Sequence, residues 1–204
     1  MSTLLATGFD QAMAPIGELT SPIMAEFAAR NGFDFKVVRN IQDEQMSGYC
    51  FGLLETALEI ERYSRVIWME SDILITNLDY RIPELSPGLH VSRDWGSDAV
   101  DDDHFSTCAF IANKDAEPLF RYLIMNEPEW RNQPFPFQEP LRRLRREEGW
   151  AKSLIHVHPR KMFNCVPSDI PGAIEPWQEG DWLCHLTHIP VEKRVELFHK
   201  IANR

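Results

Sequence analysis

The most informative stretch of the sequence is Arg65-Val66-Ile67-Trp68-Met69-Glu70-Ser71-Asp72-Ile73-Leu74-Ile75. Its first part is apolar without alternation, which predicts a strand buried on both faces. Two carboxylates, Glu70 and Asp72, follow at once, and a second apolar run comes after them. Leaving both unpaired there would cost on the order of several kcal/mol. We therefore expect a positive charge to meet them. A divalent cation shared with a phosphorylated ligand fits best, because hard cations bind carboxylate, phosphate and water oxygens.

The composition is that of one ordinary globular domain of 204 residues. The net charge of −10 argues against nucleic acid as the main partner, because neutralising phosphates requires a basic face. One basic cluster, Arg142-Arg143 with Arg145-Arg146, is followed by Glu147-Glu148. We expect this cluster to be a solvated helix face with internal ion pairs.

The spacing of the cysteines and the composition of residues 1–7 bear on where in the cell the protein is found. The four cysteines are far apart and form no CxxC pair, so we expect reduced, buried thiols in a reducing compartment. Residues 1–7 lack a basic region followed by a long apolar one, and no apolar stretch approaches the length of a membrane span. The sequence therefore predicts a cytoplasmic protein without a membrane span.

The first third of the chain alternates strand and helix. Strands are predicted at 3–7, 33–39 and 66–69, and helices at 21–30 and 51–63. Ser21 and Pro22 fit an N-cap followed by proline in the first turn. This β-α-β-α-β order is typical of a parallel sheet with helices packed on it.

Further elements are predicted downstream. Strands are expected at 73–75, 89–92, 105–112, 153–158 and 182–186, helices at 115–125, 138–148 and 191–202, and an irregular segment at 164–181. Ligands of open α/β sheets bind beyond the carboxyl ends of the strands. Glu70 and Asp72 are expected at such an end.

A block near the C-terminus, from Trp177 to His188, brings His185 to the end of a short apolar strand. Neutral imidazole is a common metal ligand and would complete a site with the distant carboxylates. Standing alone, His185 would more often be a hydrogen-bonded, partly buried histidine. That simpler interpretation is preferred for His156 and His158, whereas His188 stays open.

Gln138 and Glu139 begin a predicted helix. The simpler interpretation is first-turn polarity favoured by the helix dipole. The alternative is recognition of sugar hydroxyls through paired amide and carboxylate hydrogen bonds.

Together these elements resemble glycosyltransferases of the A fold, particularly the small retaining enzymes of the α-galactosyl/α-xylosyltransferase-like and glycogenin-like groups. Residues 66–74 match the strand "vlWlDsDilv" with its DxD metal motif. Residues 105–111 loosely match a "fNtGvfl" strand, Gln138 matches a "DQ" helix start, and residues 177–188 match a terminal "W..GDfivHfaG" block.

The resemblance implies an α/β protein, glycosyltransferase A-like, whose mainly parallel central sheet is flanked by helices with a small C-terminal extension. Residues 1–204 would form one nucleotide-sugar-dependent transferase domain, with a nucleotide-binding half at 1–95 and an acceptor-side half with the metal-completing block at 96–204. The implied donor is a nucleoside diphosphate sugar, UDP-sugar favoured, and the acceptor is a carbohydrate or another hydroxyl compound. A hexose or pentose would be transferred, with retention.

The resemblance also implies roles for individual residues. Mn²⁺ or Mg²⁺ would be held by Asp72, by His185, and by Glu70 directly or through water. Lys193 or Arg194 would reach the diphosphate, and Gln138 and Glu139 would face the reacting sugar. The remaining donor-binding positions are Thr7, Gly8, Asp10 and Ser71.

The sequence departs from the family pattern at several positions. Glu70 replaces the first aspartate of the motif, Ser106 an asparagine, Cys108 a glycine and His188 the final glycine, and Glu139 follows Gln138 where the family has an acid before it. Two alternatives therefore remain: a nucleotide-sugar-binding homologue without transferase activity, and a metal-dependent phosphohydrolase.

Overall fold

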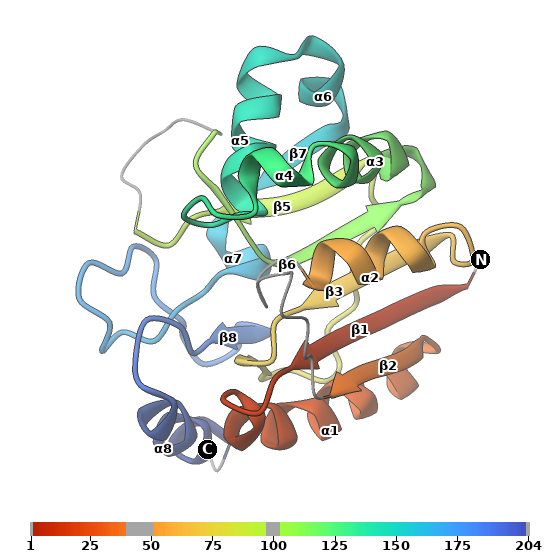
Figure 1. The fold of residues 1–204 in the computed structure, drawn as a ribbon. Coiled ribbons are helices and arrows are strands. Elements are labelled where there is room, and N and C mark those ends of the chain that lie inside the picture. Colours follow the sequence, from red (N-terminus) through yellow and green to blue (C-terminus); the bar gives the residue numbers. More distant parts are fainter. Residues whose placement is uncertain (1, 40–50, 97–102, 203–204) are drawn as a thin grey trace.

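A six-stranded mixed sheet forms the centre of the computed structural model, which describes residues 2–39, 51–96 and 103–202 (Figure 1). The strand order is β2-β1-β3-β6-β5-β7. Only β6 runs antiparallel to its neighbours in this sheet. The strands are β1 (Thr3–Phe9), β2 (Asp34–Arg39), β3 (Arg65–Met69), β5 (Leu89–Arg93), β6 (Phe105–Asn113) and β7 (Ile155–His158). The predicted parallel β-α-β-α-β unit is confirmed by the pairing of β1 with β2 and β3.

A second, two-stranded sheet pairs β4 (Ile73–Ile75) antiparallel with β8 (Leu183–His185). Its strands come from the two halves of the chain, and Ile73 lies opposite His185. This pairing carries the C-terminal block to the end of β3.

Helices cover both faces of the central sheet (Figure 1). Buried side chains of α2 and α3 pack on one face, and those of α1 pack on the other together with β4. Helix α8 lies beside α1. The helices are α1 (Ala14–Asn31), α2 (Phe51–Glu59), α3 (Glu117–Met125), α4 (Glu127–Trp130), α5 (Gln138–Glu147), α6 (Gly149–Leu154), α7 (Arg160–Phe163) and α8 (Val191–Ala202), with a 3₁₀ turn at Lys114–Ala116.

Strand β3 is buried on both faces, as its uninterrupted apolar run predicts. Val66 and Trp68 belong to the apolar cluster formed with α2 and α3. Ile67 and Met69 belong to the cluster formed with α1, β4 and Trp182. The alternation of side chains across the sheet therefore places β3 in the middle of the molecule.

The first helix begins earlier than predicted. Helix α1 starts at Ala14, has Pro15 in its first turn and continues through Pro22. Ser21 is therefore not an N-cap, because it lies buried within the helix. Buried contacts on both sides of Pro22 stabilise the helix although Pro22 lacks a backbone N–H. One of these contacts is the Thr20 hydroxyl, which donates to the carbonyl of Ser71 at 2.6 Å.

Two other predictions need correction. Residues 153–154 end helix α6, so the strand expected from 153 begins at Ile155. The basic cluster of α5 is not a solvated face throughout. Arg142 and Arg145 are nearly buried and bind Asp94 and Asp103, whereas Arg143 is exposed and pairs with Glu147 as expected. Successive helical residues differ by about 100° in direction, which divides the cluster between two faces.

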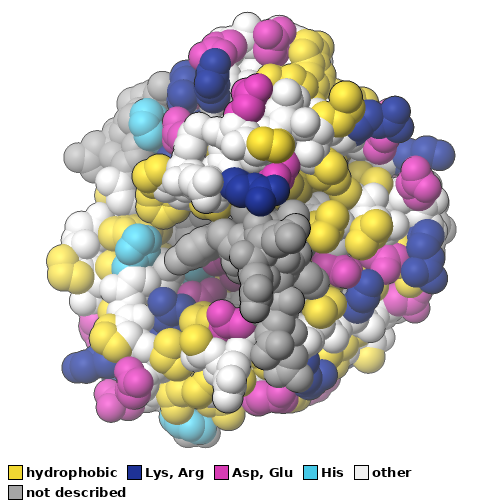
Figure 2. All heavy atoms as spheres, viewed as in Figure 1, with side chains coloured by type: hydrophobic (Ala, Val, Ile, Leu, Met, Phe, Trp, Pro, Cys, Tyr) yellow, Lys and Arg dark blue, Asp and Glu magenta, His cyan; other side chains and the backbone are white. Residues whose placement is uncertain are grey.

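Acidic and basic side chains are interspersed over the face shown in Figure 2. Among the described residues, no helix combines the length and apolar character needed to cross a membrane. Cys108, Cys165 and Cys184 are free and buried, as predicted. Cys50 lies outside the described residues.

Candidate functional site

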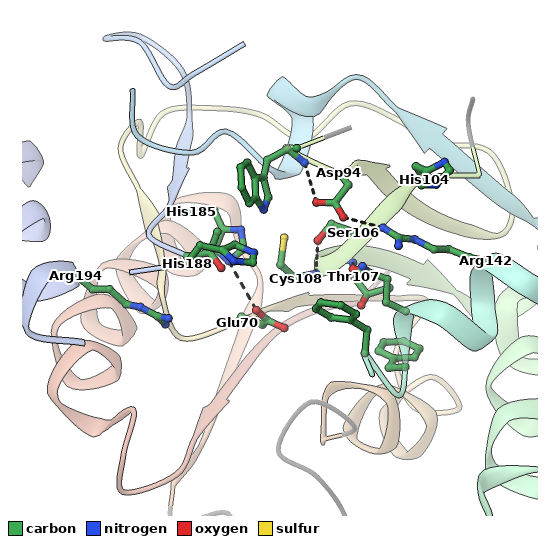
Figure 3. Close-up of a pocket in the computed structure, with 16 residues that line it drawn as sticks. Glu70, Asp94, His104, Ser106, Thr107, Cys108, Arg142, His185, His188 and Arg194 are labelled. Atoms are coloured by element: carbon green, nitrogen blue, oxygen red, sulfur yellow. Dashed lines mark hydrogen bonds and ion pairs between the residues drawn. The ribbon is translucent and has the colours of Figure 1, made fainter. Parts of the chain in front are cut away.

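Glu70, Asp72 and His185 meet at the carboxyl end of β3. His185 Nε2 lies 3.5 Å from Asp72 Oδ1 and 3.8 Å from Glu70 Oε2. One ligand atom from each residue lies within 4.8 Å of the others. The sequence places His185 far from the carboxylates, and the structure brings the three predicted ligands together (Figure 3).

Backbone hydrogen bonds fix this arrangement. The N–H of Glu70 donates to the carbonyl of Cys108 on β6, and the N–H of Leu186 donates to the carbonyl of Asp72. Ser71 lies in the turn between the two carboxylates, and its carbonyl accepts from Thr20 of α1. The turn is thus tied to β6, α1 and β8, so its two acids have little freedom to move apart.

The two carboxylates differ in their electrostatic surroundings. Burial and the neighbouring Asp72 raise the pKa of Glu70 to about 7. Burial alone would raise the pKa of Asp72, but His185 and Arg194 outweigh burial and hold that pKa below its usual value. Burial likewise opposes protonation of His185, yet Cys108 and Asp72 outweigh it, so the pKa of His185 lies well above its ordinary value.

Two atoms of this cluster have unused hydrogen-bonding capacity. Asp72 Oδ1 and His185 Nε2 are buried and have no hydrogen-bond partner among the described residues. Asp72 Oδ2 accepts from Arg194 at 2.7 Å. Buried polar atoms without partners are rare in native proteins. Asp72 Oδ1 and His185 Nε2 face each other across 3.5 Å, and carboxylate oxygens and imidazole nitrogens are ligand atoms that suit a divalent cation. The residues present therefore fit such a cation.

The cluster opens into a cavity of about 620 Å³, a size typical of small-ligand sites. Its walls come from the end of β3, the start of β6, the start of α5 and the segment between β8 and α8. Figure 3 shows Glu70, His185 and Arg194 on one side and the Asp94–Arg142 pair on the other. Charged groups therefore face the cavity from several elements.

Gln138 lines this cavity and Glu139 does not. The Gln138 side-chain oxygen accepts from the Thr107 N–H at 3.0 Å, and its amide nitrogen has no hydrogen-bond partner in the described part of the chain. Glu139 instead pairs with Arg142 at 3.5 Å and Arg146 at 3.2 Å. The geometry therefore places the amide, and not the acid, at the cavity.

Of the other predicted binding residues, Arg194 lines the cavity and the rest lie outside its walls. Thr7, Gly8 and Asp10 are at the end of β1, which runs parallel to β3, and so share the same edge of the sheet. The Thr7 hydroxyl is buried without a partner among the described residues, and Asp10 accepts from the N–H of Met13. Lys193 is exposed, whereas Arg194 lines the cavity.

Several cavity features were not predicted from the sequence. Arg142 donates to Asp94 and to the carbonyl of Phe105, each at 2.8 Å. The Trp95 ring contacts the His188 ring with centroids 4.7 Å apart. His188 has a φ of 58°, in the left-handed region that favours glycine. The sequence indicated this conformation in one way: the family pattern has a glycine at the position of His188.

No protein-family model matches the sequence, and no curated protein matches it. Solved structures do. A glycosyltransferase involved in glycosylation of the major capsid of PBCV-1 superposes with a TM-score of 0.73 at 16% identity, over 98% of this chain and 100% of that one.

The chain has the glycosyltransferase A fold. Two further structures with this fold are similar to it. The galactosyltransferase LgtC, in complex with donor and acceptor sugar analogues, matches with a TM-score of 0.55 at 13% identity, over 100% of this chain and 95% of that one. A Drosophila β1,4-galactosyltransferase 7 mutant, in complex with manganese, UDP-Gal and xylobiose, matches with a TM-score of 0.54 at 14% identity, over 95% and 74%. In this glycosyltransferase A fold, the Glu70, Asp72 and His185 cluster lies at the end of a central strand.

Proposed function

We propose that this protein is a metal-dependent glycosyltransferase that moves a sugar from a nucleoside diphosphate sugar to an acceptor hydroxyl. One observation carries the proposal. Asp72 Oδ1 and His185 Nε2 are buried, face each other across 3.5 Å and have no hydrogen-bond partner in the described part of the chain, at the edge of a cavity large enough for a small ligand. The fold supports it, because the similar solved structures are glycosyltransferases.

Asp72 and His185 would hold the cation, Mn²⁺ or Mg²⁺, and Glu70 would contact it directly or through water. A bound cation supplies Lewis-acid stabilisation of the departing nucleoside diphosphate. Asp72 is suited to this task because its pKa is held low, so it is ionised at neutral pH. Glu70 must give up a proton to contribute a charge, since its pKa is about 7.

Arg194 would bind the diphosphate. Its guanidinium donates to Asp72 Oδ2 and to the carbonyl of Ile189, so it is already held at the cavity wall. Planar donors of this kind suit phosphate oxygens. Lys193 would add charge only at the rim. Thr7, Gly8 and Asp10 at the end of β1, with the Ser71 turn, remain our candidates for contacts to the base and ribose.

Gln138 would position the reacting sugar. Its oxygen is occupied by the Thr107 N–H, which leaves its amide N–H groups to donate to hydroxyls. Glu139 would act only through its effect on Arg142, to which it is paired.

We further propose that the donor is a UDP-sugar and that a hexose or pentose is transferred with retention. Residues 1–95 would bind the nucleotide, and residues 96–204 would form the acceptor side. We also propose a cytoplasmic location.

The test is turnover of nucleoside diphosphate sugars. The protein is incubated with a panel of UDP- and GDP-sugars and Mn²⁺, and release of the free nucleoside diphosphate is measured. We expect slow release with at least one sugar and its loss in Asp72→Asn, while Arg143→Ala, an exposed change on α5, leaves it intact. Binding without release would support a nucleotide-sugar binder instead, and cleavage of unrelated phosphoesters would support a phosphohydrolase.

A further inference from the structure

Asn164 is a buried asparagine that connects His185 to the rest of the fold. It follows α7 and is 1% exposed. Its side-chain oxygen lies 2.9 Å from His185 Nδ1 and accepts from the Cys108 thiol at 3.5 Å. Its side-chain nitrogen donates to the carbonyl of Arg93, at the end of β5, at 3.3 Å.

The Arg93 carbonyl determines which way the amide of Asn164 points. A carbonyl oxygen only accepts, so the group facing it must be the N–H₂ group. Turning the amide over would place its oxygen against the Arg93 oxygen and leave the Cys108 thiol with its longer contact, 3.8 Å to the Phe163 carbonyl. Only one orientation of Asn164 therefore satisfies both neighbours.

That orientation determines which nitrogen of His185 carries a proton. Because an amide oxygen accepts, His185 Nδ1 must be the donor. When the ring gives up a proton to bind a cation, Nδ1 held as a donor keeps its proton, so the proton lost is the one on Nε2 and the lone pair appears there. Nε2 is the atom that faces Asp72 Oδ1 at 3.5 Å and Glu70 Oε2 at 3.8 Å.

We propose that Asn164 is a positioning residue that holds the His185 ring with Nδ1 as donor, so that the Nε2 lone pair is presented to a cation shared with Asp72. Asn164 acts through His185 and touches no ligand. Outer hydrogen bonds of this kind orient imidazole ligands and set the tautomer in metal sites. The inference rests on the proposed function, since it names how the cation site is prepared. It also assigns a task to the Arg93 carbonyl at the end of β5, which holds the Asn164 amide in this orientation.

The competing explanation is that Asn164 only fills buried space and contributes to stability. Substitutions separate the two explanations. Asn164→Asp keeps an oxygen acceptor for His185 Nδ1 but places a second oxygen against the Arg93 carbonyl, so it should lose stability and keep the orientation of the ring. Asn164→Ala removes both the acceptor for His185 Nδ1 and the donor to the Arg93 carbonyl. A positioning role therefore predicts that cation affinity and stability change separately in Asn164→Asp.

Mn²⁺ affinity of the whole protein is measured from the EPR signal of free Mn²⁺, and stability by urea unfolding. We expect Mn²⁺ binding to weaken by about 10- to 100-fold in Asn164→Ala, as for other changes of this type, and by no more than about threefold in Asn164→Asp. Asn113→Ala is the matched control. Asn113 also accepts and donates through its side chain, but it lies at the other end of β6, so its loss should lower stability and leave Mn²⁺ affinity unchanged. Equal weakening in both Asn164 variants, or none in Asn164→Ala, would overturn the proposal.

A second measurement needs no folded alanine variant. In ¹⁵N-histidine-labelled protein loaded with Zn²⁺ as a diamagnetic probe, the His185 signals are assigned by their absence in His185→Gln. We expect a proton on Nδ1 and none on Nε2, and the reverse assignment would contradict the proposal.

The two measurements also separate this inference from the proposed function. If the wild-type protein binds no Mn²⁺, the metal-dependent function fails. The protection of the His185 Nδ1 proton in metal-free protein, compared between wild type and Asn164→Asp, then still decides whether Asn164 holds the ring. If Mn²⁺ and nucleotide bind normally in Asn164→Ala, only the present inference fails.

Discussion

Glu70 and Asp72 are separated by one residue, but neighbouring positive groups compensate their negative charges to different extents. Asp72 has Arg194 at 2.7 Å and His185 at 3.5 Å, so its negative charge is compensated without a metal. Among the described residues, Glu70 pairs with His185 at the longer distance of 3.8 Å, and burial beside Asp72 raises its pKa to about 7. In the metal-free protein at neutral pH, Glu70 is therefore partly protonated, whereas Asp72 is ionised.

This difference predicts an effect on stability. The folded pKa of Glu70 lies above that of the unfolded chain, so ionising Glu70 costs stability as the pH rises through the range from about 4.5 to 7, and the cost is complete above that range. In metal-free protein, Glu70→Gln should therefore raise the free energy of unfolding at pH 8, on the order of 1 kcal/mol after allowing for the third of the side chain that is exposed. Urea unfolding in the presence of a chelator measures it. An equal gain at pH 5 and pH 8 would contradict the assignment.

The raised pKa of Glu70 also predicts how cation binding depends on pH. Carboxylate ligands must be ionised to bind, so Mn²⁺ binding should release the Glu70 proton and should tighten between pH 6 and pH 8. Calorimetry in two buffers of different ionisation enthalpy counts the protons released. Glu70→Gln should release about one proton fewer at pH 6 than the wild type does. The same count in both proteins would show that Glu70 is not the group that ionises.

At the scale of the elements, Arg142 joins α5 to the cavity. It donates to the start of β6 and to Asp94 beyond the end of β5, and its side chain is 10% exposed. Arg142→Met should destabilise the protein by about 2–4 kcal/mol, because it leaves a buried carbonyl and a partly buried carboxylate without their donor. Arg143→Ala is the control on the neighbouring helical position, whose exposed pair with Glu147 should contribute less than about 0.5 kcal/mol. Denaturant unfolding of the two variants compares them, and equal losses would show that the Arg142 contacts contribute little.

The elements that could be predicted are those specified by local pattern. The apolar run of β3 and the alternation of strand and helix before it require no knowledge of distant contacts. The start of α1 was not predicted, because the helix continues through Pro22 where it packs on distant parts of the chain, as in the Thr20–Ser71 contact. In the site, the carboxylates follow a strand and His185 ends one, so their positions were visible in the sequence. Asn164, the Asp94–Arg142 pair and the choice of Arg194 over Lys193 depend on how loops and helix faces meet, which no local spacing encodes.

For the whole molecule, ligand binding should appear as added stability. A ligand that binds only the folded state adds about 2.7 kcal/mol at one hundred times its Kd. Mn²⁺ with UDP should therefore raise the melting temperature of the wild-type protein more than either does alone. Asp72→Asn should abolish the joint effect, and Arg143→Ala should retain it. An equal shift in Asp72→Asn would show that the nucleotide binds without the proposed cation.

The pairing of β4 with β8 also determines when the site can exist during synthesis. Strands β1, β2 and β3 pair within the first third of the chain, whereas Ile73 meets His185 only after the C-terminal block has been made. Chains are synthesised from the N-terminus, and distant pairings close the longest loops. While the residues between Asp72 and His185 are being made, a nascent chain therefore carries both carboxylates without the histidine that completes the cluster. If the proposed function holds, cation binding at this site would therefore mark that the final strand has docked.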